Sequence, residues 1–365
     1  MQNNTIVIGG GIHGLTTAIA LADSKAKVTL LEKKQELFQG TSGSTHNRAH
    51  MGYHYPKSIE TAYECSKGLE YFKNKYPNAL FFPKKGYYII AKEGSQTTKE
   101  EYIAFCKKIE IPCIIEWPSH DFLLRAPISA PFLVTEPIFN TKLLCELLEK
   151  EALQKGVLIK KGSQVIKSTL MDGIYNIKTQ EGDKQASYKA NSVMNTTYAY
   201  ANNILKIFGL EEYMTKYRLQ TTEVVVAKTE HDIPPLTIMD GNFISIMPYV
   251  GHENHVLIYD VTNSIIEEKI GYFFNDSKSF SSNWGKMIKK GEKYFPFMHK
   301  LKYVCSLRGG RPIPIDSKIQ SRKTRLKRYE SSPGFYSLLE GKFISAPLMA
   351  KELIKMLKED GFLIK

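Results

Sequence analysis

The residues best suited to chemistry lie in three short segments that are far apart in the chain. The first is the glycine-rich turn Gly9-Gly10-Gly11-Ile12-His13-Gly14. The second, residues 40–56, combines glycines and hydroxyl residues with three histidines, and the third, residues 306–314, contains two arginines. Glycines allow a phosphate to approach backbone N–H groups, imidazoles accept protons, and guanidinium groups bind carboxylates or phosphates.

The glycine-rich turn stands between two segments that are typical of strands. Residues 5–8 are apolar and mostly β-branched, which predicts a strand buried on both faces. Residues 15–22 are small or apolar and predict a helix packed on a sheet, and residues 28–31 predict a second strand that ends in Glu32. A strand, a glycine turn, a helix and a second strand followed by an acidic residue form the βαβ fingerprint of a dinucleotide site.

Each position in this fingerprint has a physical task. Gly9 permits the tight turn, Gly11 lets the backbone approach a pyrophosphate, and Gly14 lets the helix pack closely on the strand. Glu32 is placed to accept hydrogen bonds from a ribose and disfavours a 2′-phosphate, which leaves FAD or NAD. A glycine-rich turn in an ordinary α/β core is the alternative, but the flanking strands, helix and acid favour a nucleotide.

Composition sets the class of the protein. With 365 residues, 42% hydrophobic and 24% charged, the chain predicts a globular protein of two domains, or of one domain with a large insertion. It contains no run of 18 apolar residues, and its N-terminal segment lacks the basic region of a signal peptide. The five cysteines form no CxxC pair. We therefore expect a cytoplasmic protein with reduced thiols and neither a disulfide framework nor a zinc site.

The net charge of +13 is partly concentrated in the run Lys318–Arg328. Such a run forms a solvated loop or a docking patch for anionic lipid, for nucleic acid or for a partner. It contains no aromatic platform for stacked bases, which argues against a dedicated nucleic-acid reader. The three histidines of residues 40–56 have no acidic or cysteine partner at ligand spacing, so we expect no metal.

The second and third segments carry a resemblance to a known family. Gly40-Thr41-Ser42, followed by His50-x-Gly52-x-x-Tyr55, resembles the stretch that runs along the cofactor in FAD-dependent oxidoreductases such as D-amino acid oxidase, glycerol-3-phosphate dehydrogenase and L-2-hydroxyglutarate dehydrogenase. Residues 306–314 resemble the G-x-R-P segment of that family. Gly341-Lys342, which follows a strand and precedes a helix from about residue 345, resembles its C-terminal ending.

This resemblance implies an α/β (α+β) fold with a Rossmann-like FAD-binding domain that is discontinuous in sequence. Residues 1–85, 135–215 and 305–365 would form that domain, and residues 86–134 and 216–304 an inserted antiparallel-sheet substrate domain. Local patterns further predict helices, strands, a proline-rich loop and a second helical region. The helices are 58–75, 98–108 and 140–155, the strands 86–91, 222–227, 243–247 and 256–260, the loop 112–137, and the helical region 262–295.

The cofactor implied by the resemblance is FAD. Val165 would pack at the adenine, and a turn that includes Thr196 would approach the cofactor, although Tyr198 stands where the family usually has glycine. Backbone N–H groups near Gly341 and Lys342 would stabilise negative charge on the reduced flavin ring. The full set of expected cofactor-binding residues is Gly9, Gly11, Ile12, His13, Gly14, Glu32, Lys33, Thr41, Ser42, Val165, Thr196, Gly310, Gly341, Lys342 and Phe343.

The expected reaction takes a hydride from a CH–OH or CH–NH carbon of a small, polar, anionic substrate to flavin N5. His50 and His54 are the candidates for the proton-accepting role, because a neutral imidazole is suited to it. Arg311, and after it Arg308, would clamp a carboxylate or phosphate. Tyrosine hydroxyls of the predicted sheet are further candidates for substrate contact: Tyr217, Tyr249 and Tyr259.

Two other functions are compatible with parts of the sequence. An NAD-dependent dehydrogenase would share the glycine-rich fingerprint, but it would have no need of the Gly40–Tyr55 segment or of the Gly341-Lys342 ending. A flavoprotein acting on RNA would use the positive charge. The sequence does not identify the substrate, or whether the enzyme is an oxidase or a dehydrogenase, so the electron acceptor stays open.

Overall fold

The computed structural model describes residues 3–275, 280–315, 324–339 and 341–363. Its first layer is a six-stranded sheet in the order β19-β20-β12-β1-β2-β8. All neighbouring strands in it are parallel except β19 and β20. The strands are β1 (Asn4–Ile8), β2 (Lys27–Leu31), β8 (Leu158–Lys160), β12 (Ser192–Asn195), β19 (Arg325–Arg328) and β20 (Phe335–Leu339).

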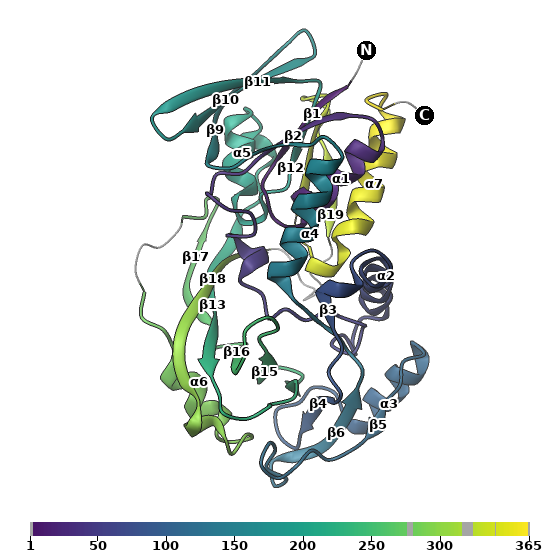
Figure 1. The fold of residues 1–365 in the computed structure, drawn as a ribbon, viewed down its shortest axis with the longest axis vertical. Coiled ribbons are helices and arrows are strands. Elements are labelled where there is room, and N and C mark those ends of the chain that lie inside the picture. The colour runs from purple at the N-terminus through teal and green to yellow at the C-terminus, as the bar shows by residue number, and fades with distance from the viewer. Residues whose placement is uncertain (1–2, 276–279, 316–323, 340, 364–365) are drawn as a thin grey trace.

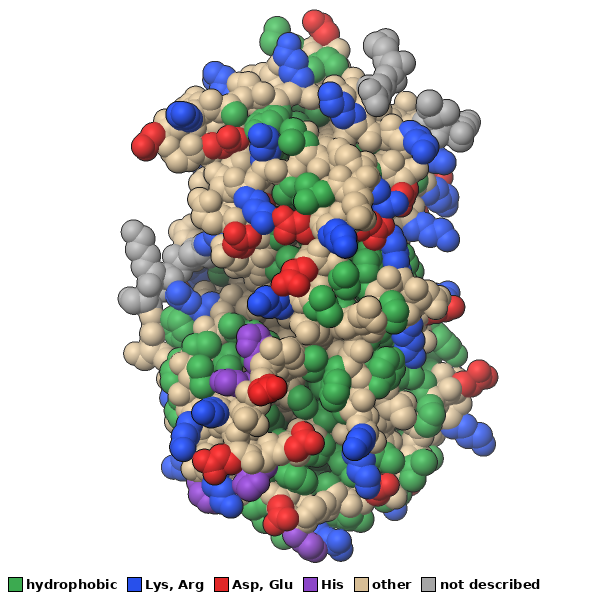
Figure 2. Space-filling model, in the orientation of Figure 1, with side chains coloured by type: hydrophobic (Ala, Val, Ile, Leu, Met, Phe, Trp, Pro, Cys, Tyr) green, Lys and Arg blue, Asp and Glu red, His purple; other side chains and the backbone are tan. Residues whose placement is uncertain are grey.

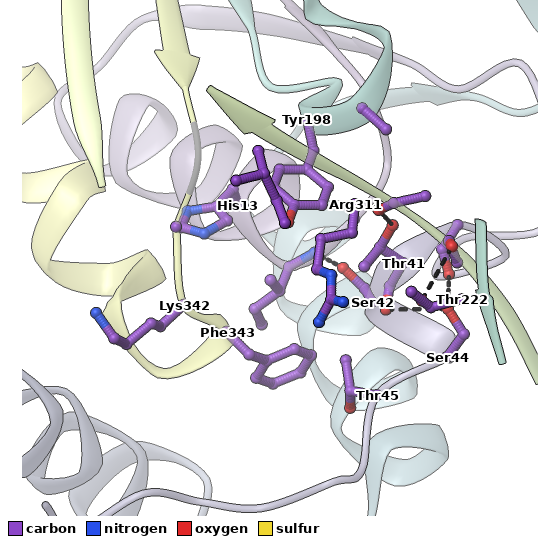
Figure 3. A pocket seen from close by; sticks show the side chains of 18 of the residues that line it. His13, Thr41, Ser42, Ser44, Thr45, Tyr198, Thr222, Arg311, Lys342 and Phe343 are labelled. Atoms are coloured by element: carbon purple, nitrogen blue, oxygen red, sulfur yellow. Dashed lines mark hydrogen bonds between the residues drawn. The ribbon is translucent and has the colours of Figure 1, made fainter. Parts of the chain in front are cut away.

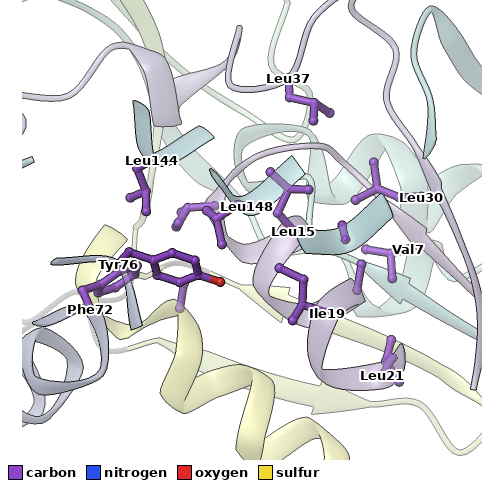
Figure 4. Close-up of a cluster of buried hydrophobic side chains, with 14 of the residues drawn as sticks. Val7, Leu15, Ile19, Leu21, Leu30, Leu37, Phe72, Tyr76, Leu144 and Leu148 are labelled. Carbon is purple, nitrogen blue, oxygen red and sulfur yellow. The ribbon is translucent and has the colours of Figure 1, made fainter. Parts of the chain in front are cut away.

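Helices pack on this parallel sheet, and a hydrophobic core lies between the helices and the sheet. Helix α1 (Ile12–Asp23) packs against α4 (Thr141–Gln154) and α7 (Ala346–Glu359), and α7 in turn contacts α2 (Ile59–Lys75). Figure 1 shows α1, α4 and α7 beside one another in the upper half of the molecule. Apolar side chains from all these elements interdigitate in one cluster, including Leu15, Phe72 and Leu148, none of them exposed (Figure 4). Segments from both ends and the middle of the chain therefore share one hydrophobic core.

The second layer is a nine-stranded, largely antiparallel sheet that occupies the lower half of Figure 1. Its order is β17-β13-β16-β15-β14-β4-β6-β5, and β18 also pairs with β13. The strands are β4 (Gly86–Ala91), β5 (Ile114–Ile115), β6 (Ile128–Val134), β13 (Tyr217–Lys228), β14 (Leu236–Met239), β15 (Ile244–Pro248), β16 (His255–Asp260), β17 (Ile265–Gly271) and β18 (Lys302–Pro314).

Smaller elements complete the fold. The described residues also form a three-stranded sheet, a two-stranded pair and three further helices. These elements are β9 (Ser163–Met171), β10 (Ile174–Glu181), β11 (Lys184–Ala190), β3 (Leu80–Phe81), β7 (Ile138–Phe139), α3 (Lys99–Lys108), α6 (Trp284–Gly291) and α5 (Ala201–Ile207). The expected combination of a parallel nucleotide-binding sheet with an antiparallel sheet is confirmed.

Two local predictions are wrong. Residues 262–295 were expected to be helical, but Ile265–Gly271 is strand β17, and among the described residues of this range only Trp284–Gly291 forms an α-helix. β17 pairs with β13 over its length, and this tertiary pairing overrides the local pattern. Residues 112–137 were expected to be a loop, but β5 and β6 lie within them, with Pro131 inside β6.

The predicted domain boundaries stay a prediction, and β18 continues across the one expected between residues 304 and 305. No helix among the described residues is long and apolar enough to span a membrane. On the face seen in Figure 2, basic and acidic side chains are interspersed. Of the Lys318–Arg328 run, residues 318–323 lie outside the described part of the chain. Arg328 pairs with Asp360 at 2.8 Å and Lys327 lies 4.7 Å from the ring centroid of Tyr213, so these two already have partners.

Candidate active site

One large cavity lies between the two main sheets and has a volume of about 2130 Å³. Pockets for drug-sized ligands are typically about 300–1,000 Å³, so this cavity has room for a dinucleotide together with a substrate. Both layers line it, with the glycine-rich turn and the C-terminal ending on one side and strands β13, β16 and β18 on the other. The three segments singled out in the sequence therefore meet at one place.

The glycine-rich turn has the shape of a phosphate cradle. Gly9 adopts φ +108°, a conformation that side chains rarely take. A Cβ on Gly14 would lie 1.8 Å from the carbonyl oxygen of Gly9, so helix α1 can approach the turn only because residue 14 has no side chain. A Cβ on Gly11 would lie 2.8 Å from Ser42 Oγ, inside the cavity lining. The residues present thus fit the pyrophosphate of a dinucleotide at the N-terminus of α1.

Glu32 follows directly after β2, at the rim of this cradle. Its Oε2 accepts from the backbone N–H of Gly10 at 2.5 Å, and its Oε1 accepts from the N–H of Lys34 at 2.8 Å. These bonds fix the carboxylate beside the turn. The neighbouring Lys33 places its ammonium 3.3 Å from the centre of the Tyr200 ring, which joins this rim to the segment that follows β12.

The segment after β12 approaches the cradle closely. Thr196 Oγ1 donates to the carbonyl of Ile8 at 2.8 Å, at the end of β1. Tyr198 adopts φ +51°, the left-handed conformation that a glycine would take without strain. The turn therefore keeps its tight course although the glycine usual at this position is absent. From the opposite layer, the carbonyl of Gly310 accepts from Thr41 Oγ1 at 2.9 Å.

The C-terminal ending faces the glycine-rich turn. A Cβ on Gly341 would lie 3.0 Å from His13 Nε2, so the two segments are in close contact. Burial lowers the pKa of His13 from 6.5 to about 4, and the imidazole is therefore neutral at pH 7. Phe343 contacts Phe38 and Phe139 with ring centroids 5.9 and 5.1 Å apart. Figure 3 shows His13, Phe343 and Arg311 around the same space.

His46 is a fixed, neutral imidazole in the cavity wall. Its Nε2 lies 3.0 Å from the carbonyl of Leu257, and its Nδ1 lies 3.3 Å from Ser245 Oγ. A carbonyl only accepts, so Nε2 carries the proton and Nδ1 accepts from the hydroxyl. Burial, and then the charge of Arg48, lower the pKa of His46 from 6.5 to about 3. The sequence analysis gave this histidine no role.

His50 lies deeper in the cavity than His54. The two imidazoles stack with centroids 5.3 Å apart, but His54 is exposed, whereas the side chain of His50 is 20% exposed. His50 Nδ1 lies 3.6 Å from Glu136 Oε1. Burial, together with the charges of Arg48 and Lys342, holds the pKa of His50 below 6.5 against the opposing effect of Glu136. A neutral imidazole at pH 7 is the form that can accept a proton.

Arg311 projects from β18 into the cavity (Figure 3). Its Nε donates to Gln220 Oε1 at 2.7 Å, and its Nη1 donates to the hydroxyl of Tyr259 at 2.8 Å. Gln220 lies directly opposite Arg311 in the β13–β18 ladder, and Tyr259 lies on β16. The guanidinium is therefore held in one orientation, which suits the bidentate recognition of a carboxylate or phosphate.

The cavity brings together nearly all the residues that the sequence analysis selected. Gly14 packs behind the turn, and Tyr217 and Tyr249 are not among the described lining residues. Tyr249 instead stacks on His252 at 4.0 Å. The selected residues that do line the cavity are Gly9, Gly11, Ile12, His13, Glu32, Lys33, Thr41, Ser42, His50, His54, Val165, Thr196, Tyr259, Arg308, Gly310, Arg311, Gly341, Lys342 and Phe343.

A buried polar group beside His50 was not expected from the sequence. Arg48 lines the cavity, Tyr88 lies on β4, and Glu136 lies between β6 and β7. Arg48 Nη1 donates to the Tyr88 hydroxyl at 2.7 Å, and that hydroxyl donates to Glu136 Oε1 at 2.7 Å. The three residues have no common spacing or motif, and only the folded chain brings them together.

The chain is similar to known proteins over most of its length. A family model described as "FAD dependent oxidoreductase" matches residues 4–356. The "FAD-dependent monooxygenase kojA" of Aspergillus flavus is 38% identical over 74 residues, which cover 20% of this chain and 17% of that protein. Most of that relative's length therefore has no counterpart in the match.

Two further proteins are similar over most of their length. The "Glycerol 3-phosphate oxidase" of Mycoplasma pneumoniae is 22% identical over 332 residues, covering 85% of this chain and 83% of that protein. The crystal structure of glycine oxidase from Geobacillus kaustophilus superimposes with a TM-score of 0.72 and 16% identity, and covers 98% of this chain and 95% of that chain. At this identity the structural likeness shows a shared fold.

Proposed function

Because this chain belongs to the family of FAD-dependent oxidoreductases, we propose that it oxidises a CH–OH or CH–NH carbon of a small anionic substrate. The observation that carries this proposal is that His50 and Arg311 line the same cavity as the cofactor cradle. One group is suited to accept a proton and the other to bind an anion. The relatives named for glycerol 3-phosphate and for glycine represent the two kinds of oxidisable carbon.

The FAD of this enzyme would be held by the glycine-rich turn, by the segment of residues 40–56 and by the C-terminal ending. The turn at Gly11 and the N-terminus of α1 suit its pyrophosphate, Glu32 its ribose, and Val165 its adenine side. The segment from Gly341 to Phe343 would contact the flavin end. When bound, FAD would supply the hydride acceptor, and the protein would supply binding, orientation and proton transfer.

The side chains divide the remaining work. Arg311, oriented by Gln220 and Tyr259, binds the carboxylate or phosphate of the substrate and so fixes which carbon lies over the reactive part of the cavity. His50 accepts the proton that leaves the substrate OH or NH. His46 stays neutral and hydrogen-bonded, so its place is in the wall of the site.

Anaerobic mixing tests this proposal. The purified holoenzyme is mixed, in the absence of oxygen, with 2-hydroxy acids, amino acids and phosphorylated polyols, and the absorbance of the bound flavin is followed. We expect bleaching by one anionic class and no bleaching by the matching neutral alcohol or amine. Bleaching by neutral compounds alone would contradict the role of Arg311. If none of these classes bleaches the flavin, the proposed substrate chemistry is wrong.

A further inference from the structure

A buried carboxylate, Glu136, lies beside His50. The Glu136 side chain is only 4% exposed, and burying a charge is costly unless it is paired and hydrogen-bonded. Its Oε2 accepts from the backbone N–H of Met51 at 2.9 Å, and its Oε1 accepts from the Tyr88 hydroxyl at 2.7 Å. Burial would raise the pKa of Glu136, but His50, Arg48 and Tyr88 hold it below its ordinary value, so the group is a carboxylate.

The arrangement differs from a simple structural ion pair. A structural arginine–carboxylate pair is commonly bidentate, with two direct N–H···O bonds. Here the Arg48 Nη1 lies 3.9 Å from Glu136 Oε1, and the Tyr88 hydroxyl stands between them. The same Oε1 lies 3.6 Å from His50 Nδ1. The carboxylate is thus held from one side by a neutral donor and faces an imidazole on the other.

We propose that Glu136 is the positioning residue for His50: it holds Nδ1–H toward its carboxylate, leaves Nε2 to accept the substrate proton, and stabilises the resulting imidazolium. In this step the substrate O–H or N–H bond breaks, an Nε2–H bond forms, and the new positive charge is balanced by Glu136. Tyr88 and Met51 orient the carboxylate. The inference rests on the proposed role of His50 as the proton acceptor.

The charges around His50 show why this carboxylate matters. Arg48, from the same loop, and Lys342, from the C-terminal ending, both disfavour a protonated imidazole. His54 stacks on one side of the ring and Tyr55 meets it edge-on, with a centroid distance of 5.2 Å. Glu136 is the group that opposes the two cations. Without it, protonation of His50 would put a third positive charge beside the other two.

The chain contains a matched control next to this group. Tyr87, the neighbour of Tyr88 on β4, donates to Glu116 Oε1 at 3.0 Å, and Lys85 donates to the same oxygen at 2.7 Å. This second group also joins a tyrosine, a carboxylate and a cation, but the Glu116 side chain is 33% exposed, and Glu116 does not appear among the described residues that line the cavity. Glu116→Gln therefore removes a tyrosine-bonded carboxylate away from His50.

The test compares wild type, Glu136→Gln and Glu116→Gln in two measurements. The pKa of His50 is measured by NMR in histidine-labelled holoenzyme without substrate, and the rate of anaerobic flavin reduction is measured against pH. We expect Glu136→Gln to lower the pKa of His50, to move the acid limb of the rate profile to lower pH, and to reduce the plateau rate by about 10- to 100-fold. Glu116→Gln is expected to change none of these.

Several results would overturn the inference. It is wrong if the Glu136→Gln plateau rate equals that of Glu116→Gln, even if the pKa of His50 moves. It is also wrong if the rate falls at every pH while neither the pKa nor the acid limb moves, because that is the signature of a merely structural role. Failure of the proposed function looks different, since wild type itself would then not be bleached by any substrate class.

A second variant covers the case in which Glu136→Gln does not fold. Tyr88→Phe keeps the carboxylate charged and removes one of the hydrogen bonds that orient it. We expect a lower plateau rate with the acid limb not moved to lower pH, because the charge that supports protonated His50 remains. A wild-type plateau rate in Tyr88→Phe, or an acid limb shifted to lower pH, would overturn the inference.

Discussion

Replacement of Arg311 by lysine tests the anion-binding step most sharply. The lysine keeps the positive charge, but it cannot donate to Gln220 and Tyr259 while also presenting a planar fork to a carboxylate. The loss is at least one charge-assisted hydrogen bond to the substrate, which is worth about 1.5–3 kcal/mol. Since about 1.4 kcal/mol is tenfold in an equilibrium constant, the dissociation constant should rise by about 10- to 150-fold.

The assay measures the substrate concentration that half-saturates anaerobic flavin reduction. Arg218→Lys is the matched control. Arg218 also lines the cavity from β13, but its side chain is half exposed and its Nε lies 3.8 Å from Glu268 Oε1. We expect Arg218→Lys to change the half-saturating concentration by less than about threefold, as for an exposed ion pair. The limiting rate of reduction should fall less than the affinity, because His50 is untouched by either change.

Two outcomes would refute this reasoning. One is an unchanged affinity of Arg311→Lys for the anionic substrate. The other is an equal loss of affinity in the Arg218→Lys control, because the effect would then not depend on the orientation of the Arg311 guanidinium. Far-UV circular dichroism and the FAD content of each variant show whether the fold is kept.

Three further predictions concern the fold around the cofactor. Gly14→Ala would place a Cβ 1.8 Å from the Gly9 carbonyl oxygen, so we expect this variant to lose most of its bound FAD. The control Gly285→Ala, where a Cβ would meet open space, is expected to keep its FAD. The FAD content of each variant is measured by absorbance after denaturation. His13 has a pKa of about 4 when folded against 6.5 unfolded, so stability should be lost as pH falls from 6.5 towards 4, by up to about 3 kcal/mol. Urea unfolding of wild type and of His13→Gln at pH 7 and pH 4 measures this loss, which should be smaller in the variant. Tyr198→Gly should stay within about 1 kcal/mol of wild type in the same assay, and Tyr198→Val should be less stable, because a β-branched residue disfavours φ +51°.

The cofactor side of the site could be predicted because its signals are local. The turn at Gly9–Gly14 and the acid at Glu32 lie within one βαβ unit, and each performs a task that only certain residue types can perform. The segments around Thr41 and Gly341 line the same cavity as this unit. The family and the cofactor were accordingly identified from short motifs, and the family model matches almost the whole chain.

The substrate side could not be predicted to the same degree. Strand β17 contains three consecutive charged residues, 267–269, and none of its seven residues is fully buried. Its sequence therefore lacks the alternation of a half-buried strand, and pairing with β13 makes it a strand. Glu136 lies in a proline-containing segment that reads as a loop. Its partners Arg48 and Tyr88 are 88 and 48 residues away, so no local pattern links them. Long-range packing decides both features.

A crystal structure of the FAD-loaded enzyme with a bound carboxylate inhibitor tests the central claim most directly. We predict that the flavin ring occupies the cavity between the segment of residues 40–56 and the Gly341-Lys342 ending. The inhibitor carboxylate should bind Arg311, and the inhibitor carbon that corresponds to the oxidisable carbon of the substrate should lie on the side of His50. A flavin ring located outside this cavity, or an inhibitor carboxylate bound to another cation and not to Arg311, would contradict the account.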